Sequence, residues 1–431
     1  MKKNVRIPFK GLTAKNWTNL LLLALATYFV ISFAMPLVQG DLCRSIDYCG
    51  YYGAGLTMNA GKIADIYDSQ ILGQVQSDLF ASLNASEQYT EVISMVYLPI
   101  FMVPLKFFAL FSYPVSLLIW YLINFSGLIL YLYYFFRQVS GVKPKLMILA
   151  LLLFSYPVLL NFNYGQLNIF LVICVAEFLR SLQFYKPLRA GLWLGGWLLK
   201  PQLLILILPF LLLQKKYKAL LGFTISSILL LSASFILVGW DGMVGLKELI
   251  LESARGGAAS HYEYMMNWRM PSYYLSFFTT PTIGWIFLGL TSLITAAAPL
   301  IVFRKKREVD STEFKVGLLS ILAATTLVAF HAHIHTAMIM IPILLYLAAK
   351  GLIDKRPILL WVAIPYGVNL LLYLIGILIL GDLLPIRIGY VIEIGFGAGM
   401  LIANLFLLGW SIKHQSGVGG GSSLGQVAKL E

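Results

Sequence analysis

A short polar stretch near the N-terminus carries the residue types best able to do chemistry in this chain. It runs from Asp41 through Asp47, Tyr51 and Tyr52 to Gly55, directly after an apolar segment long enough to cross a bilayer. A carboxylate can act as a general base, and tyrosine rings offer a sugar flat apolar contact together with hydroxyl partners. Asp47 lies among the tyrosines, whereas Asp41 fits an ordinary solvated loop. We therefore take Asp47 as the candidate base.

Two cationic residues lie at positions where a side chain with only a structural role would cost free energy. Lys200 precedes Pro201 inside an apolar sequence, and a charge at the centre of a membrane helix costs about 2.5–3.5 kcal/mol. The alternative is a lysine that extends to the lipid headgroups. Arg269, in the sequence Asn267-Trp268-Arg269, offers a planar fork of donors suited to phosphate, with a structural ion pair as the alternative. Both cations are candidates for binding a phosphate.

Three histidines and two amides complete the candidate set. His331, His333 and His335 alternate at the junction of two apolar runs, where an extended turn would direct all three the same way. A zinc site is disfavoured, because no His-Glu-x-x-His pattern and no other clustered ligand accompany them. Donors to a phosphate or sugar are favoured, with interfacial histidines that have no further role as the alternative. Gln166 and Asn168 begin another apolar run, where helix capping is the alternative role. The sequence leaves open which histidine contacts a substrate.

The elements that must position these residues are membrane helices. The chain is 59% hydrophobic and 12% charged, with a mean hydropathy of +0.81, which excludes an ordinary soluble domain. Its long apolar runs lack the alternation of a β-barrel. The net charge of +13 comes from short basic clusters between apolar runs, a pattern of cytoplasmic loops rather than of a nucleic-acid-binding surface. We predict an all-α polytopic membrane protein.

One apolar run, at residues 94–111, decides the topology. It is short and contains Pro99, Pro104 and Lys106. If it dips into the outer leaflet without crossing, nearly every later basic cluster falls on the cytoplasmic side together with both termini; if it crosses, these clusters fall outside. The non-crossing interpretation predicts about 12 spanning helices, two of them shorter than the roughly 20 residues of a full span. They are expected near 17–38, 113–136, 146–161, 166–184, 188–199, 202–213, 218–239, 282–303, 314–330, 336–351, 357–380 and 388–412.

This topology gives one transmembrane domain over residues 1–415 and places the unexplained polar groups on its outer side. Residues 39–112 are expected to form a large first outer loop with interfacial helices, and 240–272 a second outer loop. Residues 416–431, rich in Gly and Ser, are expected to be a flexible C-terminal tail or an added linker.

Two further features concern the N-terminal region. Cys43 and Cys49 flank Asp47 and could form a disulfide in an oxidising compartment, although two separate thiols are favoured. The first apolar run is too long for the hydrophobic region of a signal peptide, so we expect an uncleaved helix.

Taken in order along the chain, these residues resemble glycosyltransferase family 87, the polyprenol-phosphate-mannose-dependent mannosyltransferases. The resemblance lies in Asp47-Tyr-x-x-Tyr51-Tyr52-x-Ala-Gly55, Ile66-Tyr67-Asp68, Tyr97-Leu-Pro99, Gly165-Gln166-x-Asn168, Leu199-Lys200-Pro201-Gln202, Asn267-Trp268-Arg269 and the His331–His335 turn. Two positions depart from the family pattern. Leu98 replaces the first of two paired prolines, and Thr336 stands where an acidic residue is expected.

The resemblance implies a GT-C fold and an inverting transfer, as in the glycolipid biosynthesis of a cell envelope. A sugar, with mannose favoured, would move from a polyprenyl phosphate to a hydroxyl of a lipid-linked or glycolipid acceptor at the outer face of the plasma membrane. Asp47 would be the general base, and Lys200, Arg269 and His335 would bind the donor phosphate. The sugar or acceptor would contact Tyr51, Tyr52, Gln166, Asn168, His331, His333 and Asn267.

The same resemblance implies no metal and no other cofactor. The expected partners are membrane lipids, the polyprenyl-phosphate donor and the acceptor, with neither nucleic acid nor a protein partner. Two alternatives stay open. One is a GT-C enzyme that uses polyprenyl-phosphate arabinose or glucose, and the other is a flippase or transporter of lipid-linked sugar, which should show repeat symmetry and charges near the membrane midplane. The acceptor, the linkage and the oligomeric state lie beyond the sequence.

Overall fold

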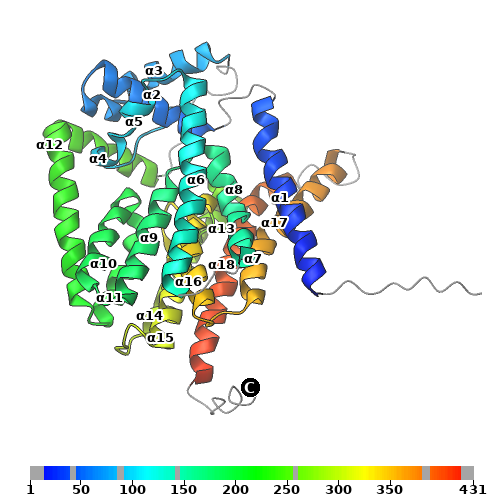
Figure 1. The fold of residues 1–431 in the computed structure, drawn as a ribbon. Coiled ribbons are helices and arrows are strands. Elements are labelled where there is room, and N and C mark those ends of the chain that lie inside the picture. Colours follow the sequence, from blue (N-terminus) through cyan, green and yellow to red (C-terminus); the bar gives the residue numbers. More distant parts are fainter. Residues whose placement is uncertain are drawn as a thin grey trace, which may run out of the picture.

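The computed structural model describes residues 14–38, 45–84, 92–140, 146–255, 261–380 and 389–418. Over these ranges the chain folds into helices joined by short turns, without a β-strand (Figure 1). In chain order they are α1 (Ala14–Val38), α2 (Ile46–Ala60), η2 (Ile63–Tyr67), α3 (Ser69–Ser82), α4 (Pro99–Met102), α5 (Leu105–Phe108), α6 (Tyr113–Ser140), α7 (Leu146–Leu153), α8 (Tyr156–Tyr164), α9 (Asn168–Gln183), α10 (Pro187–Leu194), η3 (Gly195–Leu199), η4 (Pro201–Leu204), α11 (Ile207–Leu213), α12 (Tyr217–Arg255), η6 (Tyr262–Tyr264), α13 (Arg269–Phe278), α14 (Pro281–Val302), α15 (Thr312–Val328), η7 (Ile334–Ile339), α16 (Met340–Ala349), α17 (Lys355–Leu380) and α18 (Gly389–Val418).

Six helices in the described ranges are long and apolar enough to cross a bilayer: α1, α6, α12, α14, α17 and α18. The pair α7 and α8, bent by 48°, adds a seventh if it forms one broken span. Among the other expected spans, α9, α15 and α16 have 16, 17 and 10 residues. Those expected near 188–199 and 202–213 consist of short helices on either side of Lys200 and Pro201. The polytopic helical class is therefore confirmed, whereas the expected number of about 12 spans stays a prediction.

Helices α2, α3 and α5, together with η2, lie over one end of the long helices and are called the cap below (Figure 1). Residues 94–111 supply α4 and α5, of four residues each, and neither helix is long enough to cross a bilayer. The turn between α14 and α15 lies at the opposite end of the molecule.

Residues 240–255, which we expected in a loop, are helical and continue α12. The helix bends sharply at Gly239, whose φ of 66° and ψ of −166° are accessible only to glycine. Beyond the bend, α12 crosses toward the cap and packs against η2 and α4, with Leu246 and Leu249 buried. This burial of apolar side chains explains why the segment is ordered as a helix rather than as an open loop.

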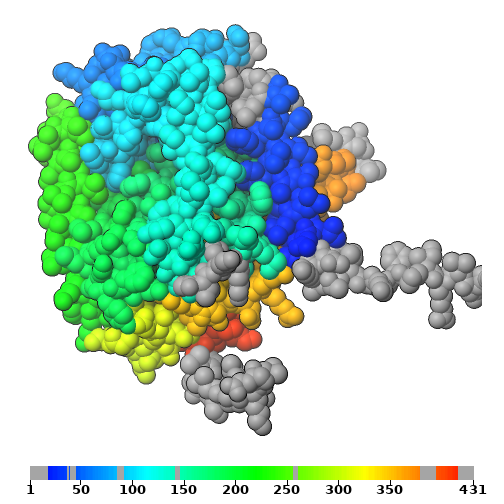
Figure 2. Space-filling model, viewed as in Figure 1, coloured from blue at the N-terminus to red at the C-terminus, as the bar shows by residue number. Residues whose placement is uncertain are grey.

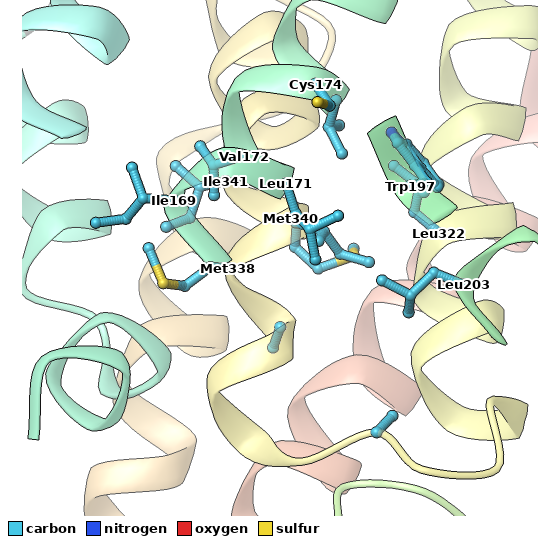
Figure 3. Packing of buried hydrophobic residues seen from close by; sticks show 14 of the residues in the cluster. Ile169, Leu171, Val172, Cys174, Trp197, Leu203, Leu322, Met338, Met340 and Ile341 are labelled. Carbon is cyan, nitrogen blue, oxygen red and sulfur yellow. The ribbon is translucent and has the colours of Figure 1, made fainter. Parts of the chain in front are cut away.

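The core beneath the cap joins α9, α15, η7 and α16 to the short helices η3 and η4. Figure 3 shows Ile169, Leu171 and Val172 of α9 near Met338, Met340 and Ile341, with Trp197, Leu203 and Leu322 alongside. Helices α15 and α16 are buried along almost their whole length, as expected of a helix surrounded by protein. On the face seen in Figure 2, α1, α6 and α12 form the outer surface, and their exposed side chains include many leucines and isoleucines.

Candidate active site

Asp47 lies in the first turn of α2, where a carboxylate interacts favourably with the unpaired backbone N–H groups of the helix. The glycines that follow it allow α2 to pack closely against the rest of the cap. A Cβ on Gly50 would come within 2.6 Å of Ile93 Cγ2, and one on Gly55 within 2.5 Å of the Leu105 carbonyl oxygen. These glycines therefore serve the packing of α2, and through it the position of Asp47.

A chain of hydrogen bonds extends from Asp47. The Gln166 amide donates from Nε2 to Asp47 Oδ2 at 2.7 Å, and the Tyr51 hydroxyl donates to Gln166 Oε1 at 3.2 Å. The hydroxyls of Tyr51 and Tyr97 lie 3.1 Å apart. Asp47 and Tyr51 share one face of α2 because they are four residues apart in a helix. The network thus joins α2, the α8–α9 turn and the segment before α4.

Tyr52, the other tyrosine expected at the substrate, is directed elsewhere. Its hydroxyl donates to the Phe111 carbonyl at 2.7 Å, and its ring packs edge-on against Tyr113 at 5.2 Å between centroids. Being five residues from Asp47, it lies on another face of α2. The structure therefore brings Tyr51, and not Tyr52, to Asp47.

Lys200 supplies a buried positive charge within electrostatic reach of Asp47. Burial raises the pKa of Asp47 to about 6, and the Gln166 hydrogen bond and the charges of Lys200 and His261 oppose that rise. Lys200 is 7% exposed, and its ammonium donates to Thr336 Oγ1 at 3.3 Å. Burial lowers the pKa of Lys200 to about 8, against the attraction of Asp47, so the side chain stays cationic at neutral pH. Among the described residues no carboxylate lies within 4.0 Å of it.

The three histidines lie together, as their alternating positions predict. The ring centroids of His331 and His333 are 4.6 Å apart, and those of His333 and His335 are 5.6 Å apart. Asn168 Nδ2 lies 3.1 Å from His335 Nδ1 and also donates to Asn161 Oδ1 at 3.1 Å. Over the described part of the chain, no three His, Cys, Asp or Glu side chains form a group that could hold a metal ion.

Asn267 and Arg269 organise the loop that enters α13. The Asn267 amide donates to the Ala329 carbonyl at 2.6 Å, and its Oδ1 accepts the Arg269 backbone N–H at 3.1 Å. Asn267 is thus occupied by backbone groups. The Arg269 guanidinium lies 3.8 Å from the centre of the Phe330 ring and donates from Nη2 to the Tyr262 hydroxyl at 3.3 Å.

The Nη1 nitrogen of the Arg269 guanidinium has no hydrogen-bond partner among the described residues. The side chain is buried, and in the part of the chain that the structure describes no carboxylate lies within 4.0 Å of it. A structural ion pair, the alternative role for this residue, is therefore not what holds it.

Electrostatic interactions link Lys200 and Arg269 to several of the other candidate residues. The Lys200 charge acts on Asp47, His331 and His335, whereas Arg269 acts on His331. Lys200 thus lies within electrostatic reach of Asp47, His331 and His335, and Arg269 within reach of His331. Hydrogen bonds join Gln166 and, through it, Tyr51 to Asp47, and they join Asn168 to His335. Tyr52 and Asn267 are turned to other partners.

Four residues of this arrangement received no role from the sequence analysis. Tyr97 extends the hydrogen-bond network of the base, Asn161 completes the amide pair at His335, His261 adds a charge near Asp47, and Thr336 contacts Lys200. Tyr97 belongs to the Tyr97-Leu-Pro99 motif, and Thr336 is a departure from the family pattern. The sequence therefore marked both positions, although it assigned them no role.

Asp41 and Cys43 lie outside the described residues. The Cys49 sulfur lies 2.9 Å from the Tyr113 hydroxyl, and whether Cys43 pairs with Cys49 stays a prediction.

Comparison with known proteins identifies a family. A protein-family model, described as Glycosyltransferase family 87, matches residues 95–330, which is more than half of the 431 residues. The matched range contains Tyr97, Gln166, Lys200 and Arg269, whereas Asp47 precedes it and the three histidines follow it. No curated protein and no solved structure matches the chain.

Proposed function

The chain belongs to glycosyltransferase family 87, and on that premise we propose that it transfers a sugar from a polyprenyl phosphate to a hydroxyl of a lipid-linked or glycolipid acceptor. The observation that carries this proposal is a half-buried carboxylate, Asp47, within electrostatic reach of a buried cation, Lys200, which has no carboxylate within 4.0 Å among the described residues. An unpaired buried charge is costly, so an anionic ligand is its natural partner.

The reaction is a single displacement with inversion at the anomeric carbon. Asp47 takes the proton of the acceptor hydroxyl while that oxygen attacks the anomeric carbon. The bond from this carbon to the phosphate oxygen breaks, and its electron pair leaves with the polyprenyl phosphate. A general base contributes about 10²–10⁴-fold in such a step. Lys200 stabilises the charge that develops on the leaving phosphate, where a water-poor site strengthens the attraction.

The histidines and Arg269 add donors around the phosphate. Burial and the charges of Lys200 and Arg269 lower the pKa of His331 to about 4, so at neutral pH its imidazole is uncharged and acts as a hydrogen-bond donor or acceptor rather than as a cation. The Nη1 of Arg269, which has no hydrogen-bond partner among the described residues, offers a further charged donor to the donor lipid.

The arrangement of the helices supports a site at the outer membrane face. The turn between α14 and α15 contains Arg304, Lys305, Lys306 and Arg307 and lies opposite the cap (Figure 1). Helix α1 begins toward that same end and α18 ends there. The positive-inside rule then puts both termini in the cytoplasm and the cap outside. We extend the proposal to a GT-C fold in the plasma membrane, with mannose as the sugar and polyprenyl phosphate as its carrier.

The test uses the purified full-length protein in lipid vesicles with radiolabelled polyprenyl-phosphate mannose, arabinose or glucose and a panel of glycolipid acceptors. A labelled glycolipid is expected with the mannose donor. Asp47→Asn should lower kcat by about 10²–10⁴-fold, while the donor still binds. Asp78→Asn is the matched control, because Asp78 is an exposed carboxylate elsewhere in the cap.

Two results would overturn the proposal. Full turnover by Asp47→Asn would exclude Asp47 as the base. Movement of the labelled lipid across the vesicle membrane without any glycosylated product would favour a flippase instead.

A further inference from the structure

The turn between α8 and α9 carries amide side chains that contact both Asp47 and His335. Gln166 reaches Asp47 Oδ2 at 2.7 Å, and Asn168 lies 3.1 Å from His335 Nδ1. We expected both amides to contact the sugar or the acceptor. Their hydrogen bonds indicate a different role.

This turn is held rigidly by its surroundings. Gly165 adopts a left-handed conformation with φ of 71°, and a Cβ there would come within 2.6 Å of Tyr48 Cβ. The Trp120 indole donates to the Gly165 carbonyl at 3.1 Å, and the Ser45 hydroxyl donates to the Asn163 carbonyl at 3.0 Å. The turn is therefore fixed to α6 and to the start of α2, the helix that carries Asp47.

The amide of Gln166 is occupied by the protein on both sides. Its Oε1 accepts from the Tyr51 hydroxyl at 3.2 Å, and its Nε2 donates to Asp47 at 2.7 Å. The carboxylate can only accept while it is ionised, so it must face the NH₂ group. The Tyr51 hydroxyl donates to the oxygen that remains and so keeps the amide in this orientation.

The NH₂ group of Asn168 is likewise occupied, whereas its Oδ1 has no hydrogen-bond partner among the described residues. Asn168 is fully buried, and its NH₂ group has two hydrogens, one for Asn161 Oδ1 and one for His335 Nδ1. An Nδ1 that accepts a hydrogen bond carries no proton, so the neutral ring is protonated on Nε2. His335 therefore presents an N–H donor on the side away from Asn168.

We propose that Gln166 and Asn168 are positioning residues rather than substrate ligands: Gln166 orients the Asp47 carboxylate, and Asn168 keeps His335 in the tautomer that donates from Nε2. The proposal rests on the proposed function for the roles of Asp47 and His335. It replaces the expected sugar contacts of both amides with contacts to the two side chains that they hold.

The first experiment replaces Gln166 with methionine, an apolar side chain of similar shape. We expect kcat to fall by about 10²-fold, the size of effect that misplacing a catalytic group has, with the KM values for donor and acceptor unchanged. The acidic limb of the pH–rate profile should move to higher pH, because the Gln166 hydrogen bond lowers the pKa of Asp47. This variant leaves unchanged the other residues that act on Asp47 electrostatically: Lys200, His261, Tyr51, Tyr97 and Tyr164.

The control is Gln76→Met. Gln76 is also a buried amide, and both its side-chain hydrogen bonds go to the backbone of Ile93. This variant should lose stability and leave the acidic limb where it is. If Gln166→Met does not fold, Tyr51→Phe removes the donor that keeps the Gln166 amide in its orientation, and it should move the limb in the same direction by a smaller amount.

The second experiment reads the His335 tautomer directly, by ¹⁵N NMR of protein labelled at its 5 histidines, with His335→Gln used to assign the signal. The wild-type ring is expected to be protonated on Nε2. Asn168→Asp should reverse the tautomer, because a carboxylate accepts from Nδ1–H. A wild-type ring protonated on Nδ1 would overturn this half of the proposal.

These outcomes separate the inference from the proposed function. If the wild type is active but Gln166→Met raises KM and leaves the acidic limb unchanged, Gln166 is a ligand and the inference fails alone. If no polyprenyl-phosphate sugar is a substrate, the proposed function fails. Infrared titration of the Asp47 carboxyl, assigned by its loss in Asp47→Asn, still shows whether Gln166→Met raises the Asp47 pKa.

Discussion

At the scale of single residues, Asp47 depends on a balance between burial and its neighbours. Burial alone disfavours the ionised carboxylate, whereas the Gln166 amide and the charges of Lys200 and His261 favour it. The resulting pKa of about 6 lies just below neutral pH. A general base with such a pKa is ionised at neutral pH and still has appreciable affinity for a proton, which is the compromise that base catalysis requires.

The pH dependence of turnover follows from this value. Asp47 must be ionised to accept a proton, so kcat/KM should rise as the pH rises through about 6 and be lost progressively below it. The measurement is a pH–rate profile of the full-length protein in vesicles. A profile that stays flat from neutral pH down through this range would contradict the assignment of Asp47.

Lys200 provides a second residue-scale prediction. Lys200→Met removes a charge that lowers the pKa of Asp47, so the acidic limb should shift to higher pH. It also removes a stabilising charge from the leaving phosphate, for which we expect kcat to fall by about 10²-fold or more. Lys106→Met is the control, since Lys106 Nζ donates to the Met58 carbonyl within the cap. Equal kinetics for the two variants would remove Lys200 from the mechanism.

At the scale of elements, the site depends on how closely α2 and the α8–α9 turn approach each other. The turn reverses the chain through the left-handed Gly165, directly against Tyr48 of α2. Only glycine satisfies both the positive φ and the lack of space. The hydrogen bond from Gln166 to Asp47 spans this same contact, so the local backbone and the position of the base are coupled.

Gly165→Ala should therefore destabilise the protein and displace Asp47 together. We expect a loss of about 1–3 kcal/mol from the backbone conformation alone, with more from the contact with Tyr48, and a large fall in kcat. Gly127→Ala in α6 is the matched control, because a Cβ there meets nothing within 4 Å and alanine favours a helix. Thermal unfolding in detergent measures the stability of both variants. Equal stability of the two would refute the coupling between the Gly165 backbone and the position of Asp47.

At the scale of the whole molecule, α2, which carries Asp47, and the basic turn between α14 and α15 lie at opposite ends of the molecule (Figure 1). A donor lipid could thus keep its polyprenyl chain beside the lipid-facing helices while its phosphate reaches Lys200. Helices α1, α6 and α12 lie at the surface in Figure 2, and their exposed leucines and isoleucines suit contact with acyl and prenyl chains.

Thiol labelling tests the proposed sidedness. In intact cells, an impermeant thiol reagent should label Asp78→Cys in the cap and should not label Lys305→Cys, which it should reach only after the membrane is opened. Both positions are exposed in the structure, so accessibility of the side chain does not distinguish them. The reverse pattern would invert the topology.

The sequence by itself determined the class of protein and supplied most of the candidate site residues. Long apolar runs cannot satisfy their backbone groups in a bilayer except as helices or closed barrels, so composition was enough to predict a polytopic helical protein. Asp47 and Lys200 could be chosen because a charged group among apolar residues has few structural reasons to be there. These inferences depend only on the type of each residue and on its neighbours along the chain, and both can be read from the sequence.

Only the tertiary structure decided which candidates work together. Tyr51 and Tyr52 are neighbours in sequence, but the turn of α2 directs one to Gln166 and the other to Phe111. Gln166 and Asn168 were expected at the substrate, yet their partners, Asp47 and His335, are 119 and 167 residues away along the chain. A hydrogen bond between such distant residues depends on how helices pack, and no local pattern in the sequence specifies it.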